Sequence, residues 1–294
     1  MSNLRDIRLR MRAIGQTLQV TKAMNLISTA KLRKGRRVLS DIEPFFTRIQ
    51  KSMIDIVSGA GKVKSEFFNP SNRDDVHHTA IIAVTSDKGL AGGYNANVFR
   101  HVTNLCQKVQ NPLLILIGSI GYRYFVHSPY VIIENYSLKS QLPGMDNAHE
   151  IAGYIISQYL CGTFDEVHIV YTHMYSSIKT LPADRQLLPL DINKLQEEFS
   201  RDGEKRVELQ FEYLPSRQEV FDALVPFYIK GIIYGALVES YASEQSSRMA
   251  AMDEASRNAE DMLASLQIRC NRERQAGITQ EISEIAGGAS ALGN

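Results

Sequence analysis

Residues 227–292 read FYIKGIIYGALVESYASEQSSRMAAMDEASRNAEDMLASLQIRCNRERQAGITQEISEIAGGASAL, and this stretch decides the fold. It follows Pro226, contains no further proline, and consists mostly of good helix formers such as Ala, Leu, Glu, Gln, Met and Arg. Because an α-helix rises about 1.5 Å per residue, about 65 helical residues reach roughly 100 Å, beyond the diameter of a small domain. The stretch therefore predicts a long helix, from about Phe227 to Leu292, that needs a partner helix or a cavity.

Apolar residues in this helix form two coiled-coil seams with alternating spacings of three and four. The first seam includes small residues that let a partner approach closely, and consists of Met252, Ala255, Ala259, Met262 and Leu266. The second seam, near the end of the chain, consists of Ile278, Ile282, Ile285, Ala289 and Leu292. The two seams are out of phase, so the polar tract between them, residues 268–277, is predicted to be where the helix leaves one partner and meets another.

The N-terminal residues 2–58 carry a heptad of their own. Twelve positions follow a strict alternation of three and four, and eight are apolar: Leu4, Ile7, Met11, Ile14, Leu18, Leu32, Leu39 and Ile42. The other four positions, Thr21, Asn25, Ser28 and Gly35, weaken the middle of the pattern. Pro44 is predicted to kink or interrupt this helix near Glu43.

The charge distribution favours pairing of the two ends. Residues 1–51 hold twelve Lys or Arg against three acidic residues, a net charge of +9. Residues 239–294 hold five Arg against nine acidic residues, a net charge of −4. Opposite charge and a matching period predict that the N- and C-terminal helices form an antiparallel coiled coil.

The region between the helices changes to short β-branched runs. Strands are predicted at 78–86, 112–118, 130–136 and 166–175, with helices near 94–110, 119–127 and 146–161, and alternation of this kind favours a mainly parallel sheet. Residues 207–215 alternate in polarity and are predicted to be an edge strand. The predicted organisation is a coiled-coil helix over 1–58, a Rossmann-like α/β domain over 59–215, and a second coiled-coil helix over 216–294.

The middle region offers one candidate phosphate loop, Ser86 to Asn95, which follows the first strand and opens a helix. Glycines and a helix N-terminus at that place are typical of nucleotide binding. The loop nevertheless reads G-x-x-G-G and matches neither the G-x-G-x-x-G fingerprint nor a Walker loop. A nucleotide-dependent enzyme remains an alternative, but tight turns and close packing explain the glycines as well.

Other candidate sites are weaker. His77 and His78 are neighbours on a strand and point to opposite faces, as do His168 and His173, so neither pair is expected to share a metal ion. The three cysteines are scattered and predict neither a disulfide framework nor a zinc site. The longest uninterrupted apolar run has a strand's length, so a soluble or peripheral protein is expected. No cofactor, metal or catalytic group is predicted.

A basic cluster, residues 31–37, leaves a second alternative open. It reads KLRKGRR and could contact nucleic acid, which would make the chain a basic coiled-coil scaffold or nucleic-acid-binding protein. The cluster holds no aromatic residue for base stacking and lies on a predicted coiled coil. A solvated helix face, or a contact with acidic protein, accounts for it equally.

Taken together, the two ends resemble the γ subunit of F-type ATP synthases. The N-terminal signature is similar over Arg8 to Met24 and Ser28 to Lys34, and the C-terminal signature over Ala242 to Met262 and Arg272 to Leu292. The middle region is similar at TSDKGLAGGYNANV, residues 85–98, and at QLLPL, residues 186–190. The resemblance covers essentially the whole chain in the family's order.

The resemblance implies a non-catalytic rotor subunit. In that family the terminal helices form the shaft of the motor, and the C-terminal end projects into a ring of three α and three β subunits. The Rossmann-like domain is a foot on the membrane c-ring, beside the ε subunit. The shaft couples ion flow through the c-ring to ATP synthesis or hydrolysis at the β subunits.

The resemblance also implies site residues and a location. Contacts with the β subunits fall on Lys22, Met24, Arg274, Gln275, Thr279 and Glu284, and the electrostatic partners of acidic β loops on Arg33, Lys34 and Arg36. Ile282, Ile285 and Leu292 would lie in the bearing at the tip. Plastid members carry an inserted cysteine pair that this chain lacks, so thiol regulation is not expected; with no transit peptide apparent, the cytoplasmic face of a bacterial cell membrane is expected. The choice between protons and sodium ions stays open.

Overall fold

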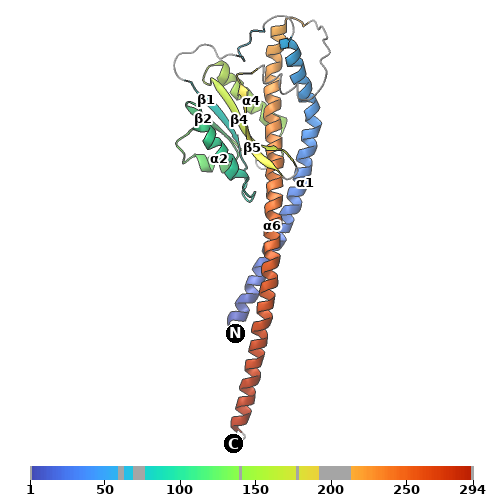
Figure 1. The fold of residues 1–294 in the computed structure, drawn as a ribbon, viewed down its shortest axis with the longest axis vertical. Helices are drawn as coiled ribbons and strands as arrows, with labels where there is room; N and C mark the ends of the chain where they lie inside the picture. The colour runs from blue at the N-terminus through green and yellow to red at the C-terminus, as the bar shows by residue number, and fades with distance from the viewer. Residues whose placement is uncertain are drawn as a thin grey trace. The chain divides into compact units, whose positions relative to one another are not determined.

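The computed structural model describes residues 2–58, 63–68, 77–138, 141–176, 179–191 and 213–292 (Figure 1). Two long helices enclose an α/β region in sequence. The described elements are α1 (Ser2–Ser58), β1 (Thr79–Val84), α2 (Tyr94–Cys106), β2 (Pro112–Ile117), α3 (Ser119–Phe125), β3 (Val131–Tyr136), α4 (Met145–Leu160), β4 (Glu166–Met174), β5 (Thr180–Leu188) and α6 (Arg217–Leu292).

The five strands form one sheet in the order β3-β2-β1-β4-β5. The pairings among β1, β2, β3 and β4 are parallel, which confirms the predicted mainly parallel sheet. The antiparallel edge strand is β5, which the sequence pattern did not reveal, because TLPADRQLL contains a proline and two charges. An edge strand tolerates Pro182, since one side of it has no ladder to complete. Most of the predicted edge strand at 207–215 lies outside the described residues.

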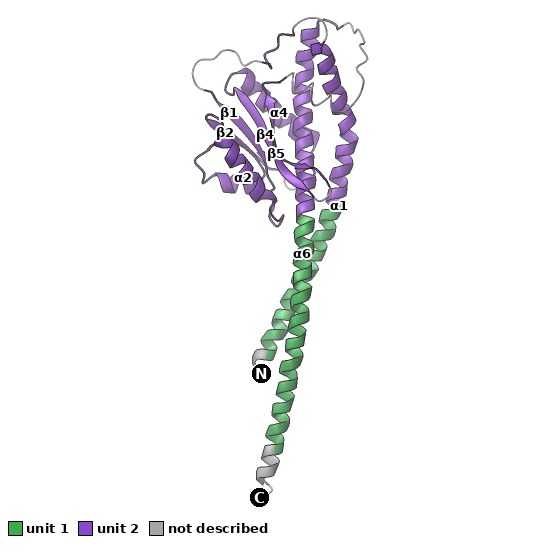
Figure 2. Ribbon diagram, in the orientation of Figure 1, with its two compact units in different colours: residues 1–29, 248–294 green, residues 30–247 purple. Residues whose placement is uncertain are grey.

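The chain divides into two compact units, coloured separately in Figure 2. Residues 30–247 form the α/β unit, and residues 1–29 with 248–294 form the coiled-coil unit. In the α/β unit all six residues of β1 are buried, and alternate side chains enter different clusters. Ile82 and Val84 join a cluster with α4 and the long helices, whereas Ile81 and Ala83 join one with α2 and α3. A sheet covered on both faces explains the continuous apolar runs of its strands.

Both long helices contain a proline, and the expected interruption at Pro44 is wrong. Helix α1 runs through Pro44, and α6 begins at Arg217 and runs through Pro226. Packing offsets the lost backbone bond: Met53 and Ile56 in α1, and Phe221 and Val225 in α6, are completely buried. The start of α6 did have a sequence signal in Ser216, whose hydroxyl accepts from the Glu219 N–H at 3.2 Å and donates to the Glu219 carboxylate at 2.9 Å.

Gly35 shows why the N-terminal heptad contains a glycine. A Cβ at this position would lie 3.3 Å from the Cβ of Ala242, tighter than ordinary contact. The absence of a side chain lets α1 and α6 approach closely inside the α/β unit. Gly35, which weakens the predicted heptad, is therefore required for the packing of α1 against α6.

Replacing Gly35 with leucine is expected to destabilise the protein by about 2 kcal/mol, because the extra atoms force the two helices apart. The matched control is Gly15→Leu on the same helix, where a Cβ meets nothing within 4 Å. The control should be neutral or slightly stabilising, because leucine favours helices more than glycine does. Thermal unfolding followed by circular dichroism checks both variants, and equal melting temperatures would contradict the close-approach explanation.

The coiled-coil unit pairs the first part of α1, up to residue 29, with the part of α6 from Arg248 to Glu273 in antiparallel order. Asn25 contacts Met249, Thr21 contacts Ser256, and Lys22 contacts Glu260, so rising numbers on one helix match falling numbers on the other. On α1, every predicted heptad position from Leu4 to Ser28 is buried or half-buried. The predicted antiparallel coiled coil is confirmed.

One position of the predicted α6 seam is wrong. Met262 is 55% exposed, and Leu263 takes its place on the covered face. The observed seam runs through Met252, Ser256, Ala259, Leu263, Leu266, Cys270 and Glu273, a spacing of four and three. A seam spaced three then four and a seam spaced four then three both place apolar residues at several positions. The sequence pattern alone therefore could not decide between Met262 and Leu263. Burial ends at Glu273, inside the polar tract predicted as the changeover.

Candidate functional site

The candidate site on the coiled-coil unit is the part of α6 that follows Glu273. Every described side chain from Arg274 to Ala286 is exposed, although apolar residues continue to recur. The exposed fraction rises along the helix from 49% at Ile278 to 60% at Ile282 and 73% at Ile285. This face has a seam pattern but no covering helix among the described residues, as expected of a surface that meets another protein.

The predicted contact residues on this part of α6 are exposed and organised along the helix. Arg274 and Gln275 present long donor side chains, and the Thr279 hydroxyl donates to the Gln275 carbonyl oxygen at 3.0 Å. Glu284 accepts a hydrogen bond of 2.9 Å from Gln280. Leu292 is the last residue of α6.

A groove of about 630 Å³ lies where the first turns of α1 face this part of α6. Its lining combines apolar residues with charges, and includes Arg5, Arg8, Arg12, Glu273, Arg274 and Glu281. Four arginines against two glutamates make the groove basic. Its walls therefore suit an acidic partner better than a basic one.

The remaining predicted contact residues lie on α1. Lys22 is exposed and makes an ion pair of 2.7 Å with Glu260, while Met24 is half-buried. Both belong to the coiled-coil unit, together with Arg274 to Glu284. Arg33, Lys34 and Arg36 belong to the α/β unit, where the first two are exposed and Arg36 is half-buried.

The glycine-rich loop of the α/β unit, Ser86 to Asn95, carries a negatively charged side chain, that of Asp87. The Asp87 carboxylate accepts from the Ser119 N–H at 2.9 Å, at the start of α3, and from the Ser137 hydroxyl at 3.1 Å. Asn95 closes the loop by accepting from the Ser86 N–H at 3.1 Å. Asp87 thus uses donors that a phosphate would need.

The space at this edge of the sheet is also too small for a nucleotide. The cavity beside Thr85 and Asp87 measures about 20 Å³, which is room for about one water molecule. Gly118 and Gly121 are required here by packing, since a Cβ on either would collide with Thr85. The glycines of the candidate loop itself do not pack in this way: Gly92 has φ of +55°, as in a tight turn, and a Cβ at Gly89 would meet nothing within 4 Å.

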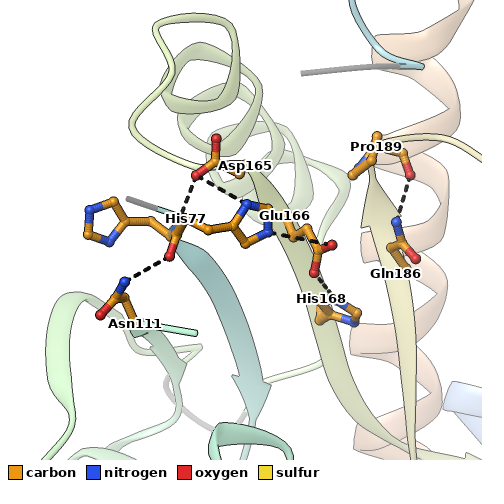
Figure 3. Close-up of polar contacts among 8 residues, drawn as sticks. His77, Asn111, Asp165, Glu166, His168, Gln186 and Pro189 are labelled. Atoms are coloured by element: carbon orange, nitrogen blue, oxygen red, sulfur yellow. Dashed lines mark hydrogen bonds and ion pairs between the residues drawn. The ribbon is translucent and has the colours of Figure 1, made fainter. Parts of the chain in front are cut away.

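Figure 3 shows the histidines at the start of β1 and β4. The His77 ring lies between two carboxylates, with Nδ1 3.9 Å from Asp165 and Nε2 3.6 Å from Glu166. His168 lies 3.5 Å from the other Glu166 oxygen. His173, outside this view, pairs instead with Glu239. The part of the chain that the structure describes contains no group of three or more His, Cys, Asp or Glu arranged to hold a metal ion.

Glu239 ties β4 to α6 inside the α/β unit. Its carboxylate accepts from the Met174 N–H at 2.9 Å and lies 2.7 Å from His173 Nδ1. Burial raises the pKa of Glu239 above its usual value, although the Met174 N–H and His173 both act in the opposite direction. The folded chain therefore binds a proton at this carboxyl at a higher pH than the unfolded chain does.

Replacing Glu239 with glutamine tests whether the pKa of this carboxyl is raised in the folded protein. A raised pKa means that the carboxyl's contribution to stability is present at low pH and is lost as pH rises through the folded-state value. The melting temperature of the natural protein is therefore expected to fall relative to that of E239Q as the pH rises through the raised pKa of Glu239. The same comparison in an H173N background shows how far the effect depends on the contact between Glu239 and His173. A difference between the two proteins that does not change with pH would contradict the raised pKa.

One described helix, α6, is long and apolar enough by composition to pass as a membrane span, with a window of mean hydropathy 1.5. Half of that window is buried inside the protein. Completely buried residues of α6 such as Ile229, Ile233 and Val238 belong to the core of the α/β unit, so core packing accounts for its hydropathy.

Comparison with known proteins agrees with these features. A family model described as ATP synthase matches residues 3–292. The ATP synthase gamma chain of Acetivibrio thermocellus is 41% identical over 294 residues, covering 99% of this chain and 100% of that protein. The ATP synthase gamma chain of Ruminiclostridium cellulolyticum is 42% identical over 292 residues, with 99% of each covered.

The fold is also similar to a solved one. A chain from the mitochondrial ATP synthase of Euglena gracilis, in a structure titled OSCP/F1/c-ring, matches with a TM-score of 0.64 and 16% identity, over 99% of this chain and 95% of that one. At that identity the match supports the fold alone, and the relatives of about 40% identity carry the assignment. This chain belongs to the family of ATP synthase gamma chains.

Proposed function

We propose that the chain is the central-stalk rotor subunit of an F-type ATP synthase. It is not catalytic itself, and it couples ion flow through the membrane c-ring to ATP synthesis or hydrolysis at three β subunits. The observation that carries the proposal, beside family membership, is the fully exposed part of α6 from Arg274 to Ala286 with its uncovered isoleucines. A helix that leaves its coiled coil with an apolar seam intact needs an external protein to receive it.

The mechanism is mechanical. Three β subunits around an asymmetric shaft each meet a different face of it, and a contact that favours one β conformation over another shifts that subunit's nucleotide affinity. Turning the shaft then shifts the three affinities in sequence. The chain's own residues supply the differential contacts and bind no nucleotide.

The contact residues are those that the resemblance to the family implies, and most of them are exposed. Arg274, Gln275, Thr279 and Glu284 face the β subunits, with Lys22 and Met24 on the neighbouring helix. Lys22 already holds Glu260 at 2.7 Å, so it would exchange that partner when a β carboxylate approaches. Arg33, Lys34 and Arg36 meet acidic β loops, and Ile282, Ile285 and Leu292 occupy the bearing.

The partners are the α and β subunits, the ε subunit and the c-ring. The chain works at the cytoplasmic face of a bacterial cell membrane, to which it is bound peripherally through the complex. The division into a helix over 1–58, a foot domain over 59–215 and a helix over 216–294 describes these roles, with the foot domain on the c-ring.

Purification of the tagged chain from its native membranes tests the proposal. Co-purifying α, β, ε and c subunits together with ATPase activity are the expected result. An untagged strain carried through the same steps is the control for adventitious binding. A chain that purifies alone, or with nucleic acid, would overturn the rotor assignment in favour of a coiled-coil scaffold.

A further inference from the structure

The groove between the first turns of α1 and α6 is lined by arginines that the proposed contacts with the β subunits do not include. Arg5, Arg8 and Arg12 line it from α1, and their spacings of three and four place them on one face of that helix. All three are exposed. Both helices of the groove belong to the coiled-coil unit, which is green in Figure 2.

The floor of the groove consists of small residues on α6. Ala276 and Gly277 line the groove, and a Cβ placed on Gly277 would meet nothing within 4 Å. Its volume of about 630 Å³ is within the range of about 300–1,000 Å³ that is typical of ligand pockets. The groove therefore has room for several side chains of another protein, rather than for a single ion.

The arginines of α1 carry a charge that the described part of the chain does not neutralise. None of the three makes an ion pair with a described residue, whereas Lys22 on the same helix pairs with Glu260 at 2.7 Å. Glu273 and Glu281 offset two of the four arginines that line the groove, which leaves a net charge of +2. Guanidinium groups bind carboxylates through paired hydrogen bonds, so this surplus favours an acidic occupant.

We propose that Arg8 and Arg12 bind the carboxylates of an acidic segment that enters the groove and meets Arg274 on the opposite wall. The segment belongs to the ring of α and β subunits around the shaft, so the inference rests on the proposed function and extends it to α1. Leu9 and Ile278 also line the groove and suit an apolar residue beside those carboxylates. The contact then lies between two helices rather than on α6 alone.

Photo-cross-linking in the complex purified from native membranes identifies the occupant. Benzoylphenylalanine is incorporated in place of Leu9, which lines the groove and is 53% exposed, so that every arginine is kept. Mass spectrometry should find it joined to a segment of an α or β subunit that contains at least two acidic residues. The control position is Val20, which is 58% exposed on the same face of α1, about three turns from the groove. It should join a different segment.

Charge variants test the α1 arginines. R8A/R12A should lower both the Leu9 cross-link and ion-driven ATP synthesis, the latter about tenfold, because two charge-assisted contacts are lost. R10A/R272A removes two exposed arginines that do not line the groove and should keep most of the activity. R8K/R12K keeps the charge without the paired geometry and should recover part of the activity. The melting temperature of the isolated full chain should change little in all three variants.

A steric variant tests the groove without changing any charge. Gly277→Leu places a side chain on the floor and should reduce ATP synthesis, although leucine favours the helix and should not lower the melting temperature. Gly15→Leu is the matched control, since a Cβ there also meets nothing within 4 Å and the residue does not line the groove. It should keep full activity.

The outcomes separate the two proposals. A Leu9 cross-link to a segment without acidic residues, or none where Val20 gives one, would overturn the acidic occupant. Equal losses in R8A/R12A and R10A/R272A, or full activity in G277L, would overturn it as well. A chain that purifies without α and β subunits would overturn the proposed function instead, and that result is seen before any cross-link is made.

Discussion

Replacing Gly118 with alanine is expected to lower the melting temperature of the protein by about 10 °C, because two costs of folding coincide at this residue. Gly118 follows β2 with φ of +102°, a region that side-chain-bearing residues rarely adopt. An added Cβ would also lie 2.7 Å from the carbonyl carbon of Thr85, in backbone that cannot move without breaking the sheet. Backbone strain and overpacking together cost about 4 kcal/mol.

The matched control for this prediction is Gly153→Ala in α4. A Cβ at Gly153 meets nothing within 4 Å, and alanine favours helices, so this variant should gain about 0.5–1 kcal/mol. Thermal unfolding of the full chain followed by circular dichroism gives both values. Equal melting temperatures for G118A and G153A would show that the turn relaxes around the methyl group, and would refute the close packing of Gly118 on Thr85.

Replacing Arg274 with alanine is expected to reduce ion-driven ATP synthesis by the assembled complex about tenfold. Arg274 is exposed, lines the basic groove, and belongs to the part of α6 proposed to meet the β subunits. Loss of one hydrogen bond to a charged group costs about 1.5–3 kcal/mol, and each 1.4 kcal/mol corresponds to about a factor of ten. The rate of synthesis in membrane vesicles, normalised to the amount of complex, is the measurement.

Arg272 supplies the control for charge alone. It is exposed on the same helix but lies about 200° around the axis from Arg274, because successive residues are about 100° apart. Arg272→Ala should therefore keep most of the activity. If both variants lose activity equally, the helix acts through its total charge, and the assignment of Arg274 to a specific contact fails.

Much of the long-helix architecture could be predicted from local patterns. The α1 heptad from Leu4 to Ile42 is covered at every predicted position, including Thr21 and Ser28, which are among its most buried members. A heptad is a spacing of residues within one helix, so it can be recognised in the sequence without knowing the partner helix. Alternating β-branched and helical runs likewise sufficed for the parallel sheet.

Other features depended on contacts between distant residues. The α6 seam contains Leu263 rather than Met262, and the two helices continue through Pro44 and Pro226. Several arrangements fit the sequence pattern, and tertiary packing decides which of them has the lowest free energy. Strand β5 exists because β4 offers a free edge to pair with. The partners in the helix packing are distant in sequence, whereas β5 directly follows β4 in the chain and was missed because of its proline and charges.

The sequence by itself determined the two heptad-bearing helices, the mainly parallel sheet and the family, since each rests on order and spacing along the chain. Only the tertiary structure decided what the exceptional residues do. Asp87 fills the place of a phosphate, Gly35 and Gly118 permit close approach, and Thr21 meets Ser256 across 235 positions of sequence. The physical reason is that hydrogen bonding and steric fit act between atoms in space, whereas a pattern in the sequence records only which face of an element is covered.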